Sequence, residues 1–137
     1  MIFIDTSAWI ALLTPTDQFH EKGREISRRI AIAGTTLVTT DYIVSETFTH
    51  LRYNARDAHK IRKFDALLSE SEKNKNVILR WTTEKIFQQA RRILLEYSDQ
   101  KFSFTDCISF VVAKELKITE IFSFDRDFTV MGFHLLR

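Results

Sequence analysis

The chain has 137 residues, 45% hydrophobic and 28% charged, values typical of one ordinary globular domain, and we expect residues 1–137 to form a single domain. The formal net charge of +2 permits a nucleic-acid partner but excludes the strong basic bias of histone-like binders. The single cysteine, Cys107, excludes a disulfide within the chain, and no stretch approaches the roughly 20 apolar residues of a membrane span, so we expect a cytoplasmic protein without membrane attachment.

Short apolar runs alternate with amphipathic segments along the whole chain, and few glycines or prolines interrupt them. The pattern predicts strands at 2–5, 35–40, 77–81 and 120–124, with a candidate fifth strand at 133–136. Between the first two strands it predicts a helix at 7–13 and a second helix between caps at Asp17 and Gly34. The later helices are expected from the cap Asp41 to Leu51, in a basic stretch at 55–75, at 83–97 with Thr83 as cap, and at 105–116 with Thr105 as cap. Because nearly all strand residues are apolar and helices separate the strands, we expect an α/β fold with a parallel sheet covered on both faces.

Four acids stand at the predicted ends of strands or in helices that follow them: Asp5, Glu46, Asp106 and Asp125. Each has an ordinary explanation as a cap, a turn residue or a solvated side chain, although an unpaired Asp106 in a buried helix would be costly. Open α/β sheets bind ligands at the carboxyl ends of their strands, and acids that meet there favour a bound cation. Hard oxygen ligands favour Mg²⁺ or Mn²⁺, so the sequence predicts a divalent-metal site suited to phosphodiester hydrolysis.

The stretch after the third predicted helix is basic. Arg52, Arg56, Lys60 and Lys63 recur close to helical spacing, so one continuous helix would present them on a single face. Such a face is either a row of contacts to RNA phosphates or an ordinary solvated surface, and the sequence leaves both interpretations open.

Two other classes of function also remain open. An aspartyl-phosphate phosphatase or receiver domain places an acid after its first strand, but the phosphatase pattern requires a second Asp where this chain has Ser7. A non-catalytic RNA-binding module would use the basic stretch, with the acids serving as caps and surface charges.

Four segments of the chain resemble a known family: FIDTSAWIALL at 3–13, DYIVSETFTHL at 41–51, FSFTDCISFVVAKEL at 102–116 and IFSFDRDF at 121–128. They resemble the PIN domain, and more closely the VapC-type toxin ribonucleases of prokaryotic toxin–antitoxin pairs. The resemblance implies a three-layer α/β/α sandwich around a mostly parallel twisted sheet of four or five strands. It also implies a magnesium- or manganese-dependent endoribonuclease that acts as a type II toxin, with a PIN nuclease of RNA processing as the alternative.

The same resemblance implies roles for individual residues. The catalytic acids would be Asp5, Glu46, Asp106 and Asp125, with Asp5 and Asp106 as the main metal ligands and the other two binding partly through water. The auxiliary residues would be Thr6, Ser7, Thr105 and Asp127. The implied partners are an RNA substrate, a VapB-type antitoxin whose C-terminal segment blocks the acidic site, and a second copy of the chain in a homodimer.

Overall fold

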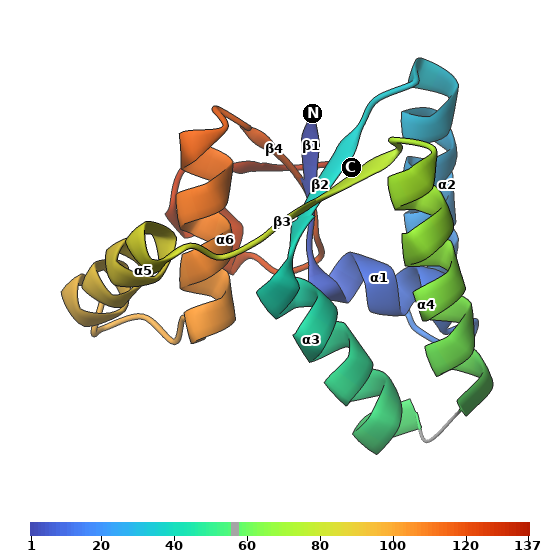
Figure 1. Ribbon diagram of the computed structural model, residues 1–137, viewed down its shortest axis with the longest axis horizontal. Coiled ribbons are helices and arrows are strands. Elements are labelled where there is room, and N and C mark those ends of the chain that lie inside the picture. Colours follow the sequence, from blue (N-terminus) through green and yellow to red (C-terminus); the bar gives the residue numbers. More distant parts are fainter. Residues whose placement is uncertain (56–57) are drawn as a thin grey trace.

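A parallel β-sheet forms the centre of the molecule (Figure 1). The computed structural model describes residues 1–55 and 58–137, and within them the sheet has five strands in the order β3-β2-β1-β4-β5. The strands are β1 (Ile2–Ile4), β2 (Leu37–Thr40), β3 (Val77–Arg80), β4 (Glu120–Phe122) and β5 (His134–Leu135). Phe3 of the central strand pairs in parallel with Val38 of β2 and with Ile121 of β4. The predicted parallel α/β fold is confirmed, including its fifth strand.

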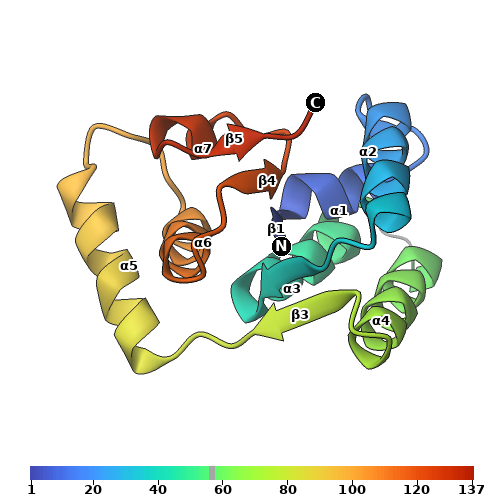
Figure 2. The same ribbon diagram turned by 90° about the horizontal axis from the view of Figure 1, so that it is seen from above.

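Helices cover both faces of this sheet (Figures 1 and 2). They are α1 (Thr6–Leu13), α2 (His20–Ala33), α3 (Asp41–His50), the π-helical turn η1 (Leu51–Ala55), α4 (Ala58–Lys73), α5 (Glu84–Glu96), α6 (Phe104–Glu115) and α7 (Asp127–Val130). Helices α5 and α6 lie on one side, α2 and α4 on the other, and α1 and α3 continue from the carboxyl ends of β1 and β2. In the described part of the chain, no helix combines the length and apolar character needed to cross a membrane.

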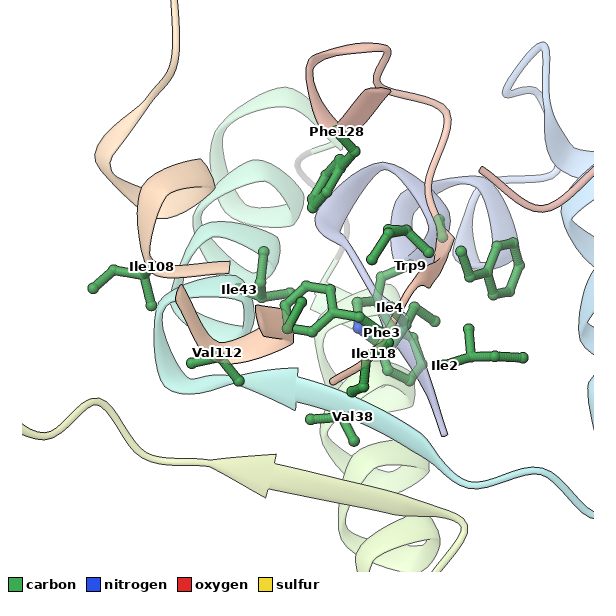
Figure 3. Packing of buried hydrophobic residues seen from close by; sticks show 14 of the residues in the cluster. Ile2, Phe3, Ile4, Trp9, Val38, Ile43, Ile108, Val112, Ile118 and Phe128 are labelled. Atoms are coloured by element: carbon green, nitrogen blue, oxygen red, sulfur yellow. The ribbon is translucent and has the colours of Figure 1, made fainter. Parts of the chain in front are cut away.

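The hydrophobic core lies between the sheet and these helices (Figure 3). Phe3 and Ile4 of β1 are fully buried, as Ile43 of α3 is, and Trp9 of α1 is only 2% exposed. Residues 106–113 of α6 are all buried, as expected for a helix that is apolar nearly all round. Burial on this scale fixes the first turn of α6, and with it Asp106, against the carboxyl end of the sheet.

The boundaries of α2 agree only in part with the prediction. Gly34 ends the helix in the left-handed conformation, with φ of +62°, as the sequence indicated. Asp17 is not the N-cap, because α2 begins at His20 after Phe19. The Asp17 carboxylate instead accepts the backbone N–H of Phe19 at 2.8 Å, in a turn that precedes the helix.

Two further predicted caps are wrong by one or two residues. The N-cap of α3 is Thr40 rather than Asp41, and the N-cap of α6 is Ser103 rather than Thr105. In both helices the capping hydroxyl belongs to the last residue in extended conformation, whose oxygen reaches the N–H group three residues on. Thr83 does cap α5, as predicted.

The basic stretch does not form one continuous helix. Arg52 lies in η1, whereas Lys60 and Lys63 lie on α4, which runs back beside α3 after the chain reverses (Figure 1). Arg56 lies outside the described residues. The expectation of a single helical face carrying all four cations is therefore wrong, because the π-helical turn ends the helical register of α3 before α4 begins.

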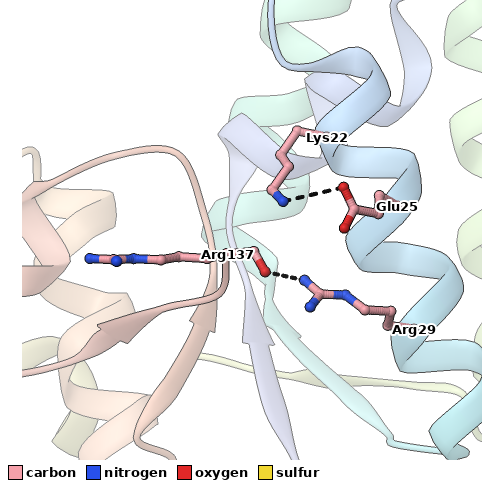
Figure 4. A network of polar contacts seen from close by, with 4 residues as sticks. All are labelled: Lys22, Glu25, Arg29 and Arg137. Atoms are coloured by element: carbon pink, nitrogen blue, oxygen red, sulfur yellow. Dashed lines mark hydrogen bonds and ion pairs between the residues drawn. The ribbon is translucent and has the colours of Figure 1, made fainter.

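Helix α2 also contacts the C-terminal residue of the chain (Figure 4). The guanidinium group of Arg29 donates a hydrogen bond to the backbone carbonyl of Arg137, and Lys22 pairs with Glu25 at 3.2 Å along the same helix. Because these groups are exposed, each contact contributes little to stability. The segment after β5 nevertheless returns across the sheet to α2.

Candidate active site

The four predicted acids line one crevice at the carboxyl end of the sheet. Asp5 directly follows β1, Asp125 follows β4, Asp106 lies in the first turn of α6, and Glu46 lies on α3. The cavity has a volume of about 510 Å³, and its other lining residues are Thr6, Ser7, Ile10, Asp17, Gln18, Phe19, His50, Phe124 and Arg126. Since β1 and β4 are neighbours and parallel, the acids that follow them meet at the same edge.

Asp5 is held by two serine hydroxyls. Its carboxylate accepts hydrogen bonds from Ser7 Oγ at 3.0 Å and from Ser123 Oγ at 2.9 Å, and it also accepts the backbone N–H of Ser7 as the N-cap of α1. Asp5 is therefore both the N-cap of α1 and a residue that lines the acidic crevice. The side chain is 4% exposed, and burial raises the pKa of this carboxyl although the serine hydrogen bonds lower it.

The two serines also connect the loop after β4 to α1. Ser7 Oγ lies 3.1 Å from Ser123 Oγ and accepts the backbone N–H of Phe124 at 2.9 Å. Ser123 Oγ accepts the N–H of Asp125 at 3.0 Å. These bonds fix the positions of Asp5 and Asp125 relative to each other, although the two acids are 120 positions apart in the sequence.

Asp106 is held by a capping box at the start of α6. Ser103 Oγ accepts the backbone N–H of Asp106 at 3.0 Å, and the Asp106 carboxylate accepts the backbone N–H of Ser103 at 2.9 Å. This reciprocal pair uses one carboxylate oxygen and orients the other. Asp106 is 9% exposed and lines the crevice.

Asp125 and Asp127 complete a compact group with Asp106. Among the described residues, these three acids each offer a carboxylate oxygen, and the three oxygens lie within 4.8 Å of one another. Asp125 Oδ1 accepts the backbone N–H of Asp127 at 2.9 Å, which brings the second acid to the same side of the loop. Asp127, which was expected to be an auxiliary residue, thus lies within the same compact group as Asp106 and Asp125.

The accumulated negative charge perturbs these carboxyls. Burial raises the pKa of Asp106 to about 7; the Ser103 N–H lowers it, and the charges of Asp5 and Asp125 raise it further. Burial and the charge of Asp125 likewise raise the pKa of Asp127. Near neutral pH the carboxyl groups of the crevice therefore do not all ionise readily, because their negative charges would repel one another. A bound cation would relieve this repulsion.

The chemistry of the donor set fits a hard divalent cation. Carboxylates from four separate chain segments line the crevice, and among the described residues that line it there is one histidine, His50, and no cysteine. Mg²⁺ and Mn²⁺ prefer oxygen ligands of this kind, whereas zinc sites usually include sulfur or nitrogen. Thr6 also lines the crevice, and its buried Oγ1 has no hydrogen-bond partner among the described residues.

The remaining predicted residues divide into two groups. Ser7 contacts Asp5 directly and Thr6 lines the crevice, as expected for residues that follow the first acid. Thr105 lines a separate hollow of about 500 Å³ with Asp41, Tyr42, Ser45 and Glu46, and it is not among the residues that line the acidic crevice. Glu46 lines both hollows, so it is neither a fully solvated residue nor a member of the compact group.

Sequence reasoning missed three residues of the site. Ser103 was detectable, because Ser-x-x-Asp just before an apolar run is the spacing of a capping box. Ser123 interrupts the apolar strand before Asp125, which is a weaker signal. Arg126, an exposed cation at the mouth of the crevice, carries no sequence signal that separates it from other surface arginines.

A family profile and a curated relative match nearly the whole chain. The profile of the PIN domain matches residues 2–134. The chain is 31% identical over 133 residues to the 23S rRNA-specific endonuclease VapC20 of Mycobacterium tuberculosis, in both strain H37Rv and strain CDC 1551, covering 97% of this chain and 95% of the relative.

Solved structures agree with this match. The crystal structure of Mycobacterium tuberculosis VapC20, described as a sarcin–ricin loop cleaving toxin, superposes with a TM-score of 0.81 at 28% identity and covers 100% of this chain and 99% of that chain. FitAcB from Neisseria gonorrhoeae superposes with a TM-score of 0.68 at 14% identity, over 100% and 97% of the two chains, and so shares the fold. The chain belongs to the PIN-domain family, among the toxin ribonucleases of toxin–antitoxin systems.

Proposed function

We propose that Asp5 and Asp106 are the main ligands of Mg²⁺ or Mn²⁺ in this ribonuclease, and that Glu46, Asp125 and Asp127 complete the site, partly through water. The observation that supports this assignment is the convergence of four separate chain segments on one crevice, with the pKa of Asp106 raised to about 7. When bound, a divalent cation supplies a Lewis acid that polarises the phosphodiester and acidifies water near neutral pH.

The chain's own residues orient these groups. Ser7 and Ser123 hold the Asp5 carboxylate through hydroxyl donors, and the Ser103 backbone holds one oxygen of Asp106. Because these contacts are formed within the protein, the carboxylates need little rearrangement when a cation and the substrate enter. A cation held beside Asp106 would lower the pKa of this carboxyl and so favour its ionised form.

A phosphodiester is itself an anion, so it approaches the acids favourably only when cations offset their charge. Arg126 stands at the mouth of the crevice and is exposed. We propose that its guanidinium group contacts a phosphate next to the bond that is cut, in the sequence-independent manner of backbone contacts. Arg52, Lys60 and Lys63 are candidates for weaker contacts to more distant phosphates. Arg56 is proposed for the same role from the sequence alone, because it lies outside the described residues.

The RNA substrate is proposed from the relatives. VapC20 is named as specific for 23S rRNA and as cleaving the sarcin–ricin loop. The similarity over nearly the full length of both proteins supports a structured loop of ribosomal RNA as the substrate of this chain as well. Readout of such a loop depends on its shape and on unpaired bases rather than on a duplex sequence.

The proposed partner in the cell is a small antitoxin. An arginine or lysine of its C-terminal segment would be strongly favoured among the crevice carboxylates, because charge-assisted pairs to partly buried acids are strong. We further propose a homodimer acting in the cytoplasm. Asp5→Ala is expected to weaken antitoxin binding, measured by calorimetry; unchanged affinity would place the contact elsewhere.

The decisive experiment is cleavage of ribosomal RNA by the purified protein with and without a chelator. Wild-type protein is expected to cut in Mg²⁺ or Mn²⁺, to stop when EDTA is added, and to resume when excess metal is restored. Asp106→Asn is expected to abolish cleavage with the fold retained by circular dichroism. Asp99→Asn is the matched control, because Asp99 is exposed in the connection between α5 and α6, outside the crevice. Cleavage that persists in EDTA, or in Asp106→Asn, would refute the assignment.

A further inference from the structure

One wall of the acidic crevice is aromatic. Phe19, just before α2, and Phe124, just after β4, both line the cavity that the carboxylates line. Their rings are stacked face to face, with centroids 4.4 Å apart and planes inclined by 3°. Phe19 remains 38% exposed, whereas the other crevice residues that carry large apolar side chains are at least half-buried. An apolar ring exposed inside a polar catalytic crevice calls for a physical reason.

The protein holds the Phe19 ring in place from its backbone outward. Asp17 accepts the backbone N–H of Phe19 at 2.8 Å, and the N–H of Gly23 donates to the Phe19 carbonyl at 2.8 Å. Phe124 covers one face of the ring, and is itself held by the edge of Phe122 at a centroid distance of 6.3 Å. The exposure of Phe19 therefore belongs to a rigid, supported ring rather than to a loosely placed side chain.

We propose that Phe19 is a stacking platform for one unpaired nucleobase of the RNA, next to the phosphodiester cleaved at the acids. This inference rests on the proposed function. A base presents a flat π-face that matches an exposed ring, and aromatic side chains bind unpaired bases in this way in RNA recognition. The wall and the acids belong to one cavity of about 510 Å³, so a nucleotide seated there has its base on Phe19 and its phosphate directed to the acids.

Two neighbours add polar contacts to the same wall. The Gln18 side chain lines the cavity beside Phe19 and offers an amide to the edge of a base, and Arg126 lies beside Phe124 and offers a guanidinium to a phosphate. The acids carry the chemistry, while the aromatic wall selects RNA in which a base is turned out of a helix. The class of substrate is thus an RNA loop or bulge rather than a regular duplex.

The test compares Phe19→Leu, Phe19→Trp and a matched control, all in the cleavage-deficient Asp106→Asn background. Leu keeps an apolar contact with Phe124 but removes the π-face. The control is Phe87→Leu, because Phe87 is 37% exposed and has one aromatic neighbour, Phe104, yet lies on α5 outside the crevice. The probe is a fluorescein-labelled synthetic hairpin carrying the sarcin–ricin loop, with Kd measured by fluorescence polarisation.

Phe19→Leu is expected to raise Kd at least about fivefold, the lower end of what one base–aromatic stack contributes. Phe19→Trp is expected to bind as tightly as the parent, and Phe87→Leu within about twofold of it. Hairpins with a single abasic site then form a double-perturbation cycle. At one loop position, removing the base should weaken hairpin binding by the parent protein by the same factor as Phe19→Leu weakens binding of the intact hairpin. Combining the abasic hairpin with Phe19→Leu should then cause no further loss of affinity.

Additive losses at every loop position, or equal Kd for Phe19→Leu and the parent, would overturn the proposal. Loss of antitoxin binding by Phe19→Leu without loss of RNA binding would also overturn it and would assign the wall to the protein partner. These outcomes are separate from a failure of the ribonuclease assignment, which would be seen as absent or chelator-insensitive cleavage by the wild-type protein in the preceding experiment.

Discussion

The raised pKa of Asp106 predicts that the metal-free protein loses stability as pH rises. Its folded-state pKa is about 7, against an ordinary value of 3.8. Since the folded-state value is the higher one, the stability contributed by this group is full below pH about 4 and is lost as pH rises through about 7. At about 1.4 kcal/mol for each pH unit between those values, the upper limit of this loss is on the order of 4 kcal/mol.

Asp106→Asn removes the charge but keeps the shape and an oxygen that can accept the Ser103 N–H. In EDTA at pH 8 we expect this variant to be more stable than the wild type by roughly 2 kcal/mol, about half of the upper limit, because water and side-chain relaxation reduce the penalty of the native carboxylate. For a chain of this size that corresponds to a rise in Tm of roughly 6 °C. At pH 5 the two proteins should melt within about 2 °C of each other.

Thermal unfolding followed by circular dichroism measures these differences. Adding 5 to 10 mM Mg²⁺ or Mn²⁺ at pH 8 should raise the Tm of the wild type and leave the Tm of Asp106→Asn nearly unchanged. The difference in Tm between the two proteins should therefore become smaller or change sign. Asp99→Asn again serves as the control and should follow the wild type throughout. If Asp106→Asn were no more stable than the wild type at pH 8 without metal, the repulsion inferred among the acids would be wrong.

Four other substitutions test residues that support or surround the site. Ser123→Ala is expected to cost about 1 to 3 kcal/mol by urea unfolding and to lower the cleavage rate at least about tenfold, because both Asp5 and the N–H of Asp125 lose a partner. Ser103→Ala should lower both Tm and the cleavage rate, because the capping box is lost. Thr105→Val should leave the cleavage rate within about twofold of the wild type. A larger loss would show that Thr105 takes part in the active site. Arg126→Ala is expected to raise KM more than it lowers kcat, and to reduce the salt dependence of KM.

Most of the fold followed from the pattern of residues along the chain. Short β-prone runs such as 2–5 and 77–81 have little freedom to be anything but strands, and the helical segments between them are long enough to require parallel crossovers. The carboxyl ends of parallel strands then meet at one edge whatever the details of packing. The placement of Asp5 and Asp125 in one crevice was therefore predictable before any coordinate was known.

The errors arose where tertiary context decides between neighbouring residues of similar propensity. Thr105 and Ser103 are both good caps, and the capping box that Ser103 forms with Asp106 starts the helix at Ser103. Arg52 and Lys60 have helical spacing, but a π-helical turn and a chain reversal separate them. The closeness of Asp127 to Asp106 and Asp125 was also not visible in the sequence, because it depends on α7, a helix of four residues that a periodic pattern cannot reveal.

The arrangement of the serines explains why the acids alone were an incomplete description of the site. A carboxylate that is 4% exposed, as Asp5 is, needs donors to keep a defined orientation, and Ser7 and Ser123 supply them from two different segments. The same hydroxyls accept backbone N–H groups of the loop that carries Asp125. One pair of small side chains thus connects the start of α1, next to Asp5, with the loop after β4 that carries Asp125. A site built in this way depends on hydroxyl positions that give no periodic signal, so the pattern of acids in the sequence describes only part of it.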